Sequence, residues 1–280
     1  MYLVFDIGAT NTRVARSKDG NTFDRYSIVK TPKAFDDGMN LFKQTADSLL
    51  EGAKVKGIGG GIAGPLVKDK TGLADAKSLA GWARKPLTKT LEKSFGAPAF
   101  LENDTAVVGL GELHHGAGKG AHIAVYMTVS TGVGGCRFVD GEVDQNSFGF
   151  EPGHQIIQFG DKKTKCGCGG YGHLEGYISG TAIEKLHGVS PQEITDTKVW
   201  DNTAHILAVG LNNISVLWSP DVIILGGSMM KKPGISITDT KKYLKELLTL
   251  SPQVPKVVHA NLGDLGGLYG GLVLIQKNKK

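Results

Sequence analysis

The sequence predicts an α/β protein made of two related lobes, and three observations lead to this prediction. The chain has 280 residues, enough for two lobes of about 140 residues each. Strand patterns alternate with helical patterns along its length. A strand, a glycine-containing turn and a second strand occur near residues 2–17 and again near 123–139, so the second half begins as the first half does.

The first half contains four candidate strands, at residues 2–6, 12–17, 56–65 and 98–104. Apolar residues at helical spacing predict helices over 36–54 and 105–115. The glycine-containing stretch 114–122 is the best candidate for a linker. We therefore expect an N-terminal lobe over 1–115 and a C-terminal lobe over 116–280.

The second half contains four further candidate strands, at residues 123–129, 136–140, 221–227 and 256–261. Residues 204–218 place apolar side chains on one helical face. A final helix opens after Asn261, and it is a candidate for packing back on the N-terminal lobe.

Composition excludes several classes of protein. Hydrophobic residues make up 40% and charged residues 21% of the chain, which is typical of a globular protein and unlike a disordered one. The 40 glycines are clustered without a triplet repeat, which excludes collagen and indicates loops where the backbone lies close to a ligand. No apolar run approaches the roughly 18 residues that span a bilayer, so no membrane partner is expected.

Charge and cysteine content predict a cytoplasmic protein that binds no nucleic acid. The net charge of +5 comes from scattered Lys and Arg, with no basic stripe and no docking motif for nucleic acid. The chain has three cysteines and no export signal at its start. An odd cysteine count of this kind favours a reducing compartment over a disulfide framework.

Two glycine turns could bind phosphate. In the first, DIGATNT at 6–12, backbone N–H groups and hydroxyls could surround phosphate oxygens while Asp6 holds Mg²⁺ through water. Alone, this segment is better explained as an ordinary hairpin turn. STGVGG at 130–135 is the matching turn of the second half, and two such turns facing each other would enclose a polyphosphate. Neither matches the P-loop or dinucleotide-binding patterns.

The segment LEND at 101–104 suits a general base. A carboxylate at a strand end, beside an amide, can take a proton from a hydroxyl: Asn103 would orient the substrate and Asp104 would accept the proton. The alternative is a helix N-cap, and the two roles are compatible because one residue can cap while its neighbour reacts.

Four metal-ligand side chains lie within 20 residues, at His154, Cys166, Cys168 and His173. This set fits a tetrahedral Zn²⁺ site, and four protein ligands leave no open position, so the zinc would be structural. It would fix the loop that carries Glu151 and Glu175, whose carboxylates could accept hydrogen bonds from a polyhydroxy ligand. The alternative is two free cysteines and two surface histidines.

Seven segments in this order resemble the sugar kinases of the ROK family: DIGATNT, LENDTA, STGVGG, EPGH, CGCGGYGHLE, IILGGS and GDLGGLYGG. The resemblance covers essentially the whole chain. It implies a two-lobed, actin-like ATPase (ribonuclease H-like) fold with the active site in the interlobe cleft. It also implies transfer of phosphate from MgATP to a hexose hydroxyl, usually the 6-OH. We further expect a homodimer.

The resemblance assigns roles residue by residue. Asp104 is the expected catalytic base. The expected sugar ligands are Asn103, Asp104, Glu151, His154, Glu175 and Gly64. The expected phosphate and Mg²⁺ residues are Asp6, Gly8, Thr10, Thr131 and Gly132, and the adenosine loop contains Gly226 and Gly227. The zinc positions are His154, Cys166, Cys168 and His173, so His154 would serve zinc with one ring nitrogen and sugar with the other.

Glucose is the leading expected substrate, because the CGCGGxG zinc loop resembles glucokinases and N-acylhexosamine kinases more than fructokinases. Departures from the family pattern are His173 in place of a third cysteine, Ala9 in the first turn, Thr105 after the base, and Ser78. A family repressor would carry a helix-turn-helix ahead of the first turn, and the strand beginning at Tyr2 leaves no room for one. A regulator without catalysis would lack the base or a phosphate turn, and both are present.

Overall fold

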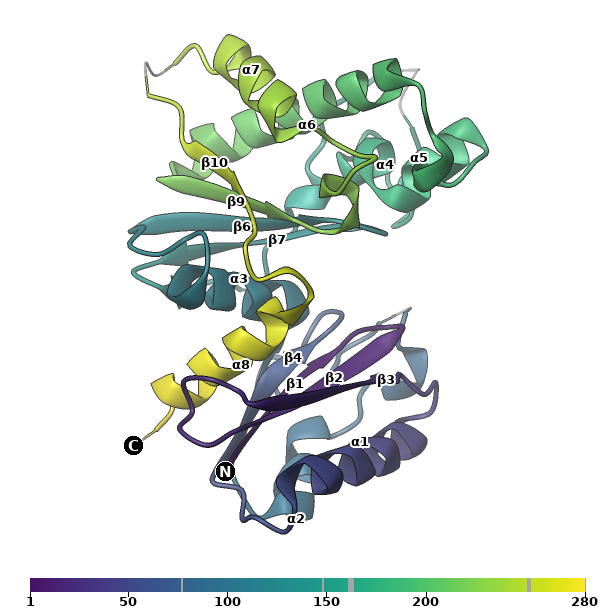
Figure 1. Ribbon diagram of the computed structural model, residues 1–280. Coiled ribbons are helices and arrows are strands. Elements are labelled where there is room, and N and C mark those ends of the chain that lie inside the picture. Colours follow the sequence, from purple (N-terminus) through teal and green to yellow (C-terminus); the bar gives the residue numbers. More distant parts are fainter. Residues whose placement is uncertain (77, 148, 161–163, 251–252, 280) are drawn as a thin grey trace. The chain divides into compact units, whose positions relative to one another are not determined.

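The protein consists of two compact units in the computed structural model, which describes residues 1–76, 78–147, 149–160, 164–250 and 253–279 (Figure 1). The first unit combines Met1–Gly116 with Leu262–Lys280, and the second is Ala117–Asn261. The chain therefore leaves the first unit once and returns to it for its last helix. No helix in the described ranges is both long enough and apolar enough to cross a membrane.

The first unit is built on a five-stranded sheet in the order β3-β2-β1-β4-β5. Its strands are β1 Tyr2–Ile7, β2 Asn11–Ser17, β3 Arg25–Lys30, β4 Gly57–Ile62 and β5 Ala99–Asn103. β1, β2 and β3 are antiparallel, whereas β1, β4 and β5 are parallel. Ile7 pairs with Ile62, and Ile62 pairs with Asn103. The carboxyl ends of three parallel strands therefore meet at one edge of the sheet.

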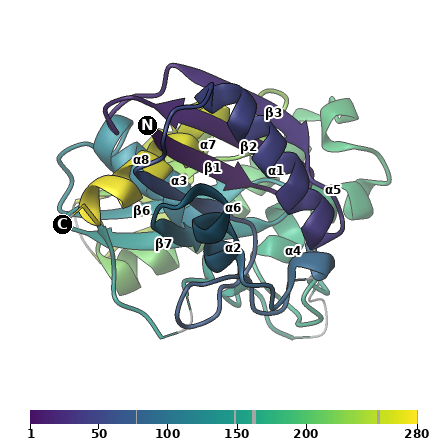
Figure 2. The same ribbon diagram turned by 90° about the horizontal axis from the view of Figure 1, so that it is seen from below.

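Helices cover both faces of this sheet (Figures 1 and 2). They are α1 Phe35–Leu50 and α2 Leu87–Phe95 on one side, and α3 Asp104–His115 and α8 Gly266–Lys277 on the other. Short 3₁₀ helices lie at Ala80–Trp82 and Gly263–Leu265. β4 is rich in glycine because α8 lies against it: a Cβ on Gly59 would lie 2.4 Å from the carbonyl oxygen of Gly271.

The helix expected over 36–54 ends earlier, at Leu50. Glu51 has φ 51° and Gly52 has φ 82°, so two consecutive left-handed residues turn the chain out of the helix. The N–H of Glu51 still bonds to the carbonyl oxygen of Asp47. The apolar spacing continues past this point in the sequence, but the backbone does not.

The second unit contains a similar sheet in the order β10-β9-β6-β7-β8. Its strands are β6 Ile123–Val129, β7 Val133–Val139, β8 Glu142–Val143, β9 Val222–Gly226 and β10 Lys256–His259. β6, β9 and β10 are parallel, and β7 is antiparallel to β6 and β8. The carboxyl ends of β6 and β9 again lie side by side, with Thr128 paired to Gly226.

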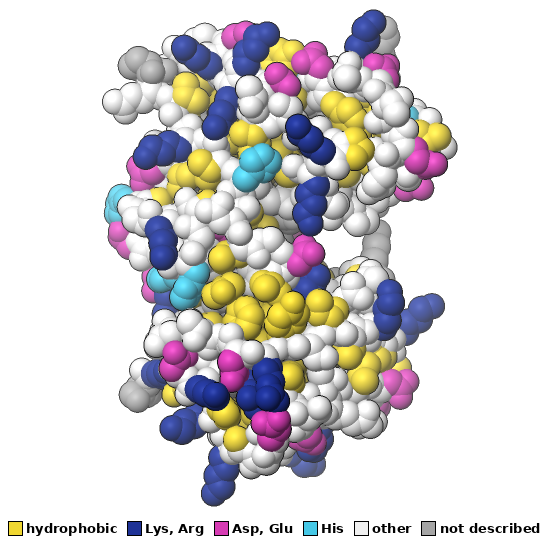
Figure 3. All heavy atoms as spheres, viewed as in Figure 1, with side chains coloured by type: hydrophobic (Ala, Val, Ile, Leu, Met, Phe, Trp, Pro, Cys, Tyr) yellow, Lys and Arg dark blue, Asp and Glu magenta, His cyan; other side chains and the backbone are white. Residues whose placement is uncertain are grey.

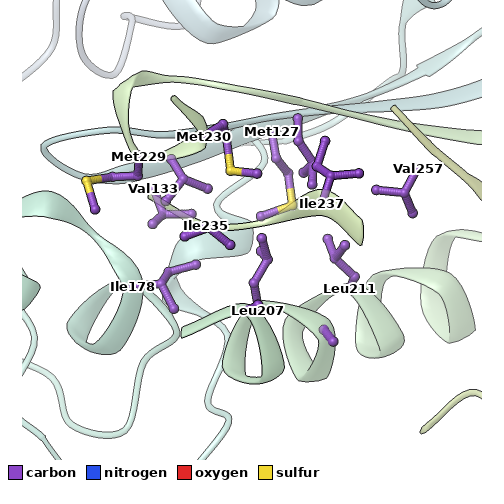
Figure 4. Packing of buried hydrophobic residues seen from close by; sticks show 14 of the residues in the cluster. Met127, Val133, Ile178, Leu207, Leu211, Met229, Met230, Ile235, Ile237 and Val257 are labelled. Atoms are coloured by element: carbon purple, nitrogen blue, oxygen red, sulfur yellow. The ribbon is translucent and has the colours of Figure 1, made fainter. Parts of the chain in front are cut away.

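Helices pack an apolar core against one face of the second sheet. They are α4 Glu175–Ile178, α5 Gly180–His187, α6 Thr197–Trp218 and α7 Ile237–Leu247, with 3₁₀ helices at Pro152–His154, Pro191–Glu193 and Ser228–Met230. Figure 4 shows Leu207 and Leu211 of α6 facing Met127, Val133 and Val257. On the molecular face in Figure 3, Lys and Arg side chains lie scattered among acidic ones.

Candidate functional site

The first candidate phosphate turn joins β1 to β2 at the edge where the parallel strands end. Asp6 is the second-last residue of β1, and the Gly8 N–H bonds to the carbonyl oxygen of Asn11 at 3.0 Å. Thr31 stabilises the turn by donating a hydrogen bond from Oγ1 to the Gly8 carbonyl oxygen at 2.7 Å. Thr10 is exposed at the tip. These two hydrogen bonds hold the turn, and its exposed tip can reach a ligand.

Asn103 connects the end of β5 to the end of β4. Its Oδ1 accepts from the N–H groups of Thr105 at 3.0 Å and Ala106 at 3.3 Å, which makes it the N-cap of α3. Its Nδ2 donates to the carbonyl oxygen of Gly64 at 3.0 Å. The second Nδ2 hydrogen has the capacity to donate to a ligand. Two of the candidate sugar contacts, Asn103 and Gly64, thus lie together.

Asp104 is the first residue of α3 and has the electrostatics of a base. Burial, followed by the negative charge of Asp6, raises the pKa of Asp104 to about 6. The N–H of Thr105 donates to its Oδ1 at 2.8 Å, which opposes the rise in pKa. A carboxylate with a pKa about one unit below neutrality is ionised at pH 7 and still basic enough to accept a proton.

Asp6 lies in a charged cluster of the same unit. Burial raises its pKa, and the guanidinium of Arg13, whose Nη1 is 3.3 Å from Asp6 Oδ2, opposes that rise. Asp264, near the start of α8, adds negative charge that raises the pKa further. Sequence reasoning missed Arg13; a cation in the strand after the DIGATNT turn was the available signal.

Sequence reasoning also missed the pair formed by Lys70 and Glu102. Glu102 is buried in β5 immediately before Asn103. Its Oε1 accepts from the N–H of Asn103 at 3.0 Å, and its Oε2 pairs with Nζ of Lys70. The available signal was an acidic residue in a strand with buried positions, because a buried charge requires a partner of opposite charge.

The second candidate phosphate turn and the candidate adenosine loop lie at the carboxyl ends of β6 and β9. Thr131 and Gly132 are in the turn between β6 and β7, and Gly226 ends β9. Ser130 Oγ lies 3.1 Å from Ser228 Oγ, which joins the turn to the loop. Gly227 has φ 96°, and a Cβ there would lie 2.2 Å from the Val129 carbonyl oxygen, so this close approach requires glycine.

The four candidate zinc ligands form a cluster, because their ligand atoms all lie within 4.8 Å of one another. His154 Nδ1 is 3.8 Å from Cys166 Sγ, and His173 Nδ1 is 3.2 Å from Cys168 Sγ. Zinc bonds of about 2.0–2.3 Å at tetrahedral angles place neighbouring ligand atoms roughly 3.3–3.8 Å apart. The set therefore fits a zinc ion with two thiolates and two imidazoles. Residues 161–163 of the loop 151–175 lie outside the described residues.

The chemistry of the cluster also suits a metal. Burial is the largest of the effects that raise the pKa of the Cys166 thiol to about 11, so at neutral pH a cation would have to replace its proton. His154 uses Nδ1 toward Cys166, while its Nε2 is 4.0 Å from Glu151 Oε2. One ring nitrogen thus faces the cluster and the other faces a candidate sugar ligand. The pKa of Glu151 is raised overall, mainly by burial; the nearby His154 opposes the rise and Glu175 adds to it.

Glu175 begins α4 and contacts two parts of the second unit. Its Oε1 lies 3.3 Å from Cys166 Sγ, and its Oε2 accepts from the N–H of Val133 at 2.9 Å. Val133 is the first residue of β7, immediately after the second candidate phosphate turn. The candidate sugar ligand therefore also contacts the base of that turn.

A cavity of about 790 Å³ in the second unit lies away from these residues. It is lined by Asp221 and Val222 at the start of β9 and by Lys256 at the start of β10. Because both strands are parallel, this is the edge opposite to Gly226. The candidate catalytic and ligand-binding residues lie at the carboxyl ends of the strands, so they do not line this cavity.

Comparison with known proteins gives a single family. The family model described as "ROK family" matches residues 2–278. An N-acetyl-D-glucosamine kinase from Histophilus somni is 28% identical over 98% of each chain. A glucokinase from Halalkalibacterium halodurans is 26% identical over 99% of this chain and 96% of its own. A putative fructokinase from Bacillus subtilis is 29% identical over 79% of this chain and 78% of its own.

Solved structures share the fold over the whole chain. A ROK hexokinase from Thermus thermophilus superposes with a TM-score of 0.87 at 25% identity, covering 99% of this chain and 98% of its own. A ROK family glucokinase from Streptomyces griseus, solved with glucose and AMPPNP, gives a TM-score of 0.81 at 23% identity over 99% of both chains. The two-lobed, actin-like ATPase fold expected from the sequence is confirmed.

Proposed function

The chain is a sugar kinase of the ROK family, and from that premise we propose that it transfers the γ-phosphate of ATP to a hexose hydroxyl, with glucose as substrate and glucose 6-phosphate as product. The observation that carries the proposal is Asp104: a half-buried carboxylate that directly follows a parallel strand, beside a capping amide and close to the first candidate phosphate turn. Its raised pKa suits proton abstraction from a hydroxyl near neutral pH.

In the proposed reaction, Asp104 takes the proton of the sugar hydroxyl as its oxygen attacks the γ-phosphorus. The bond from that phosphorus to the bridging oxygen breaks, and ADP leaves with the electron pair. Asn103 holds the sugar through its free amide hydrogen, and Gly64 is placed next to it by the Nδ2 bond. Mg²⁺ bound with ATP would neutralise charge on the phosphates, and Asp6 would hold it through water.

The other phosphate and adenosine contacts are proposed in the turns. Thr10 of the first unit, and Thr131 and Gly132 of the second, would donate to phosphate oxygens. Gly8, whose N–H is bonded to the carbonyl oxygen of Asn11, would shape the first turn around the phosphate. Gly226 and Gly227 would lie along the adenosine. The hydrogen bond between Ser130 and Ser228 supports this assignment, because it holds the phosphate turn and the adenosine loop together.

The zinc loop is proposed to bind the sugar. His154, Cys166, Cys168 and His173 would hold one structural zinc ion. Glu151, His154 and Glu175 would accept or donate hydrogen bonds to sugar hydroxyls, with Nε2 of His154 directed to Glu151. Zinc would thus fix the sugar-binding side chains without taking part in the chemistry.

The choice of hexose rests on the zinc loop. The curated relatives are divided among glucokinase, N-acetyl-D-glucosamine kinase and putative fructokinase, so N-acylhexosamine and fructose kinase activities are the alternatives. The glucokinase from Streptomyces griseus was solved with glucose and AMPPNP, which supports ATP as donor and glucose as acceptor. A role in glycolysis, a cytoplasmic location and a homodimer belong to the same proposal.

A coupled assay of ADP release tests the proposal. Purified protein with MgATP is assayed over glucose, fructose, mannose, allose, N-acetylglucosamine and N-acetylmannosamine. We expect the largest kcat/KM with glucose, and Asp104→Asn as the matched inactive control. Preference for an N-acylated sugar or fructose would select that alternative, and ADP release with none of the sugars would favour a sugar-sensing regulator.

A further inference from the structure

The zinc loop and the second phosphate turn are joined by one side chain, Glu175. One carboxylate oxygen lies 3.3 Å from Cys166 Sγ, a candidate zinc ligand. The other accepts from the backbone N–H of Val133 at 2.9 Å. The carboxylate therefore bridges a candidate metal ligand and the residue that closes the turn at Ser130–Gly132.

The segment that follows the zinc ligands holds this turn at further points. Gly180, at the start of α5, donates its N–H to the carbonyl oxygen of Ser130 at 2.7 Å. The N–H of Thr181 donates to the carbonyl oxygen of Thr131 at 3.4 Å. Together with the Glu175 bond, these contacts fix the turn from three positions between residues 175 and 181.

Little free space lies between the carboxylate and the turn. A Cβ on Gly132 would lie 2.8 Å from Glu175 Oε2. α4 also lies against the zinc ligands: a Cβ on Gly176 would be in ordinary van der Waals contact with the Cα of Cys166, at 3.6 Å, and the Gly176 N–H donates to the carbonyl oxygen of His173 at 3.0 Å. A displacement of the zinc ligands would therefore move the start of α4, and with it Glu175 and the N–H of Val133.

We propose that Glu175 is a positioning residue for the nucleotide: it transmits the order of the zinc site to the second phosphate turn and so sets nucleotide affinity. This role rests on the proposed function, since it needs the turn to bind phosphate, and it is separate from contact with sugar. A turn that is already held in one conformation loses less conformational entropy when its N–H groups bind a phosphate. A charged acceptor makes the stronger kind of hydrogen bond for that purpose.

Glu151 provides a matched control. It is an acidic residue of the same loop and a proposed sugar ligand, but its carboxylate faces Nε2 of His154 at 4.0 Å. In the described part of the chain, no hydrogen bond or ion pair joins its carboxylate to the turn at Ser130–Gly132. Loss of Glu151 should therefore weaken sugar binding and leave nucleotide binding unchanged.

The test is calorimetric titration with AMPPNP and Mg²⁺ in the absence of sugar, with zinc content measured on each sample. Glu175→Ala should bind AMPPNP about 10-fold more weakly than wild type, the size expected for loss of one hydrogen bond to a charged group. Glu175→Gln, which keeps an acceptor for Val133, should stay within about 2-fold, as should Glu151→Ala. Zinc-stripped wild type should lose about as much affinity as Glu175→Ala.

Unchanged AMPPNP affinity in folded Glu175→Ala, or in zinc-stripped wild type, overturns this inference and leaves the kinase proposal intact. If Glu175→Ala does not fold, the zinc-stripped protein decides the matter alone. An equal loss in Glu151→Ala also overturns it, because that result would make the effect general to the loop. Wild type that binds no AMPPNP contradicts the proposed function itself, and the inference with it.

Discussion

Replacing Asp104 with Asn should make the protein more stable while it stops the reaction. The folded protein raises the pKa of this carboxyl from 3.8 to about 6. A shift of about two units corresponds to about 3 kcal/mol of differential interaction between the two protonation states. Asn keeps the shape and an acceptor for the Thr105 N–H but carries no charge.

The direction of the pH dependence follows from linkage. A folded-state pKa above the unfolded value means that the folded protein holds this proton more tightly between about pH 4 and pH 6. The wild type therefore loses stability from this group as pH rises through that window, and the full cost is present above pH 6. The gain in free energy of unfolding for Asp104→Asn should be near zero at pH 4 and up to about 3 kcal/mol at pH 7.

Denaturant unfolding of both proteins at several pH values measures the difference, and turnover is measured on the same samples. The variant should lose about 10²–10⁴-fold in turnover with little change in sugar affinity, and wild-type kcat/KM should rise through about pH 6. Asp19→Asn is the control: backbone hydrogen bonds from Thr22 and Asn21 lower the pKa of Asp19 to about 2, so its pH dependence has the opposite sign. A stability gain for Asp104→Asn that is the same at pH 4 and pH 7 would refute the reasoning.

Three further predictions follow from the same structure. Glu102→Gln should raise the sugar KM more than it lowers kcat, because it weakens the pairing of Glu102 with Lys70, and Glu102 in turn accepts a hydrogen bond from Asn103. In the same kinetic assay, Lys70→Arg should retain more sugar affinity than Lys70→Met. Purified protein should contain about one zinc per chain by plasma emission spectroscopy, and His173→Cys should retain this zinc whereas His173→Ala should lose it. Zinc affinity should fall at acid pH, because every ligand must be deprotonated to bind the metal. Wild-type protein that is fully active without zinc would contradict the site. Leu207→Ala should cost about 2–5 kcal/mol in denaturant unfolding, and a loss below 1 kcal/mol would show that α6 is not packed as described.

Elements with both a pattern and a boundary signal could be predicted from the sequence. The strand at 98–104 ends in Asn and Asp, and the structure has β5 to Asn103, with that side chain capping α3. The edge strand β3 was missed because most of Arg25–Lys30 is exposed and shows no buried pattern. α7 was missed although Ser236 caps it, because its apolar face is narrow.

Candidate site residues were found where a motif carries them, and missed where only tertiary structure brings them together. Asp104 and the four candidate zinc ligands lie in short, dense motifs. Lys70 reaches Glu102 across 32 residues of sequence, and its placement depends on a left-handed turn at φ 53°. The bond from Glu175 to Val133 likewise joins residues 42 apart, and sequence spacing alone contains no sign of it.

Phosphoryl transfer itself is tested most directly by phosphorus NMR of the product. Wild-type protein is incubated with MgATP and glucose, and the spectrum is compared with that from Asp104→Asn. We expect the γ-phosphate signal to be replaced by that of a sugar 6-phosphate monoester in step with ADP, and almost no such signal from the variant. Inorganic phosphate in place of a sugar phosphate, or equal product from Asp104→Asn, would contradict the account.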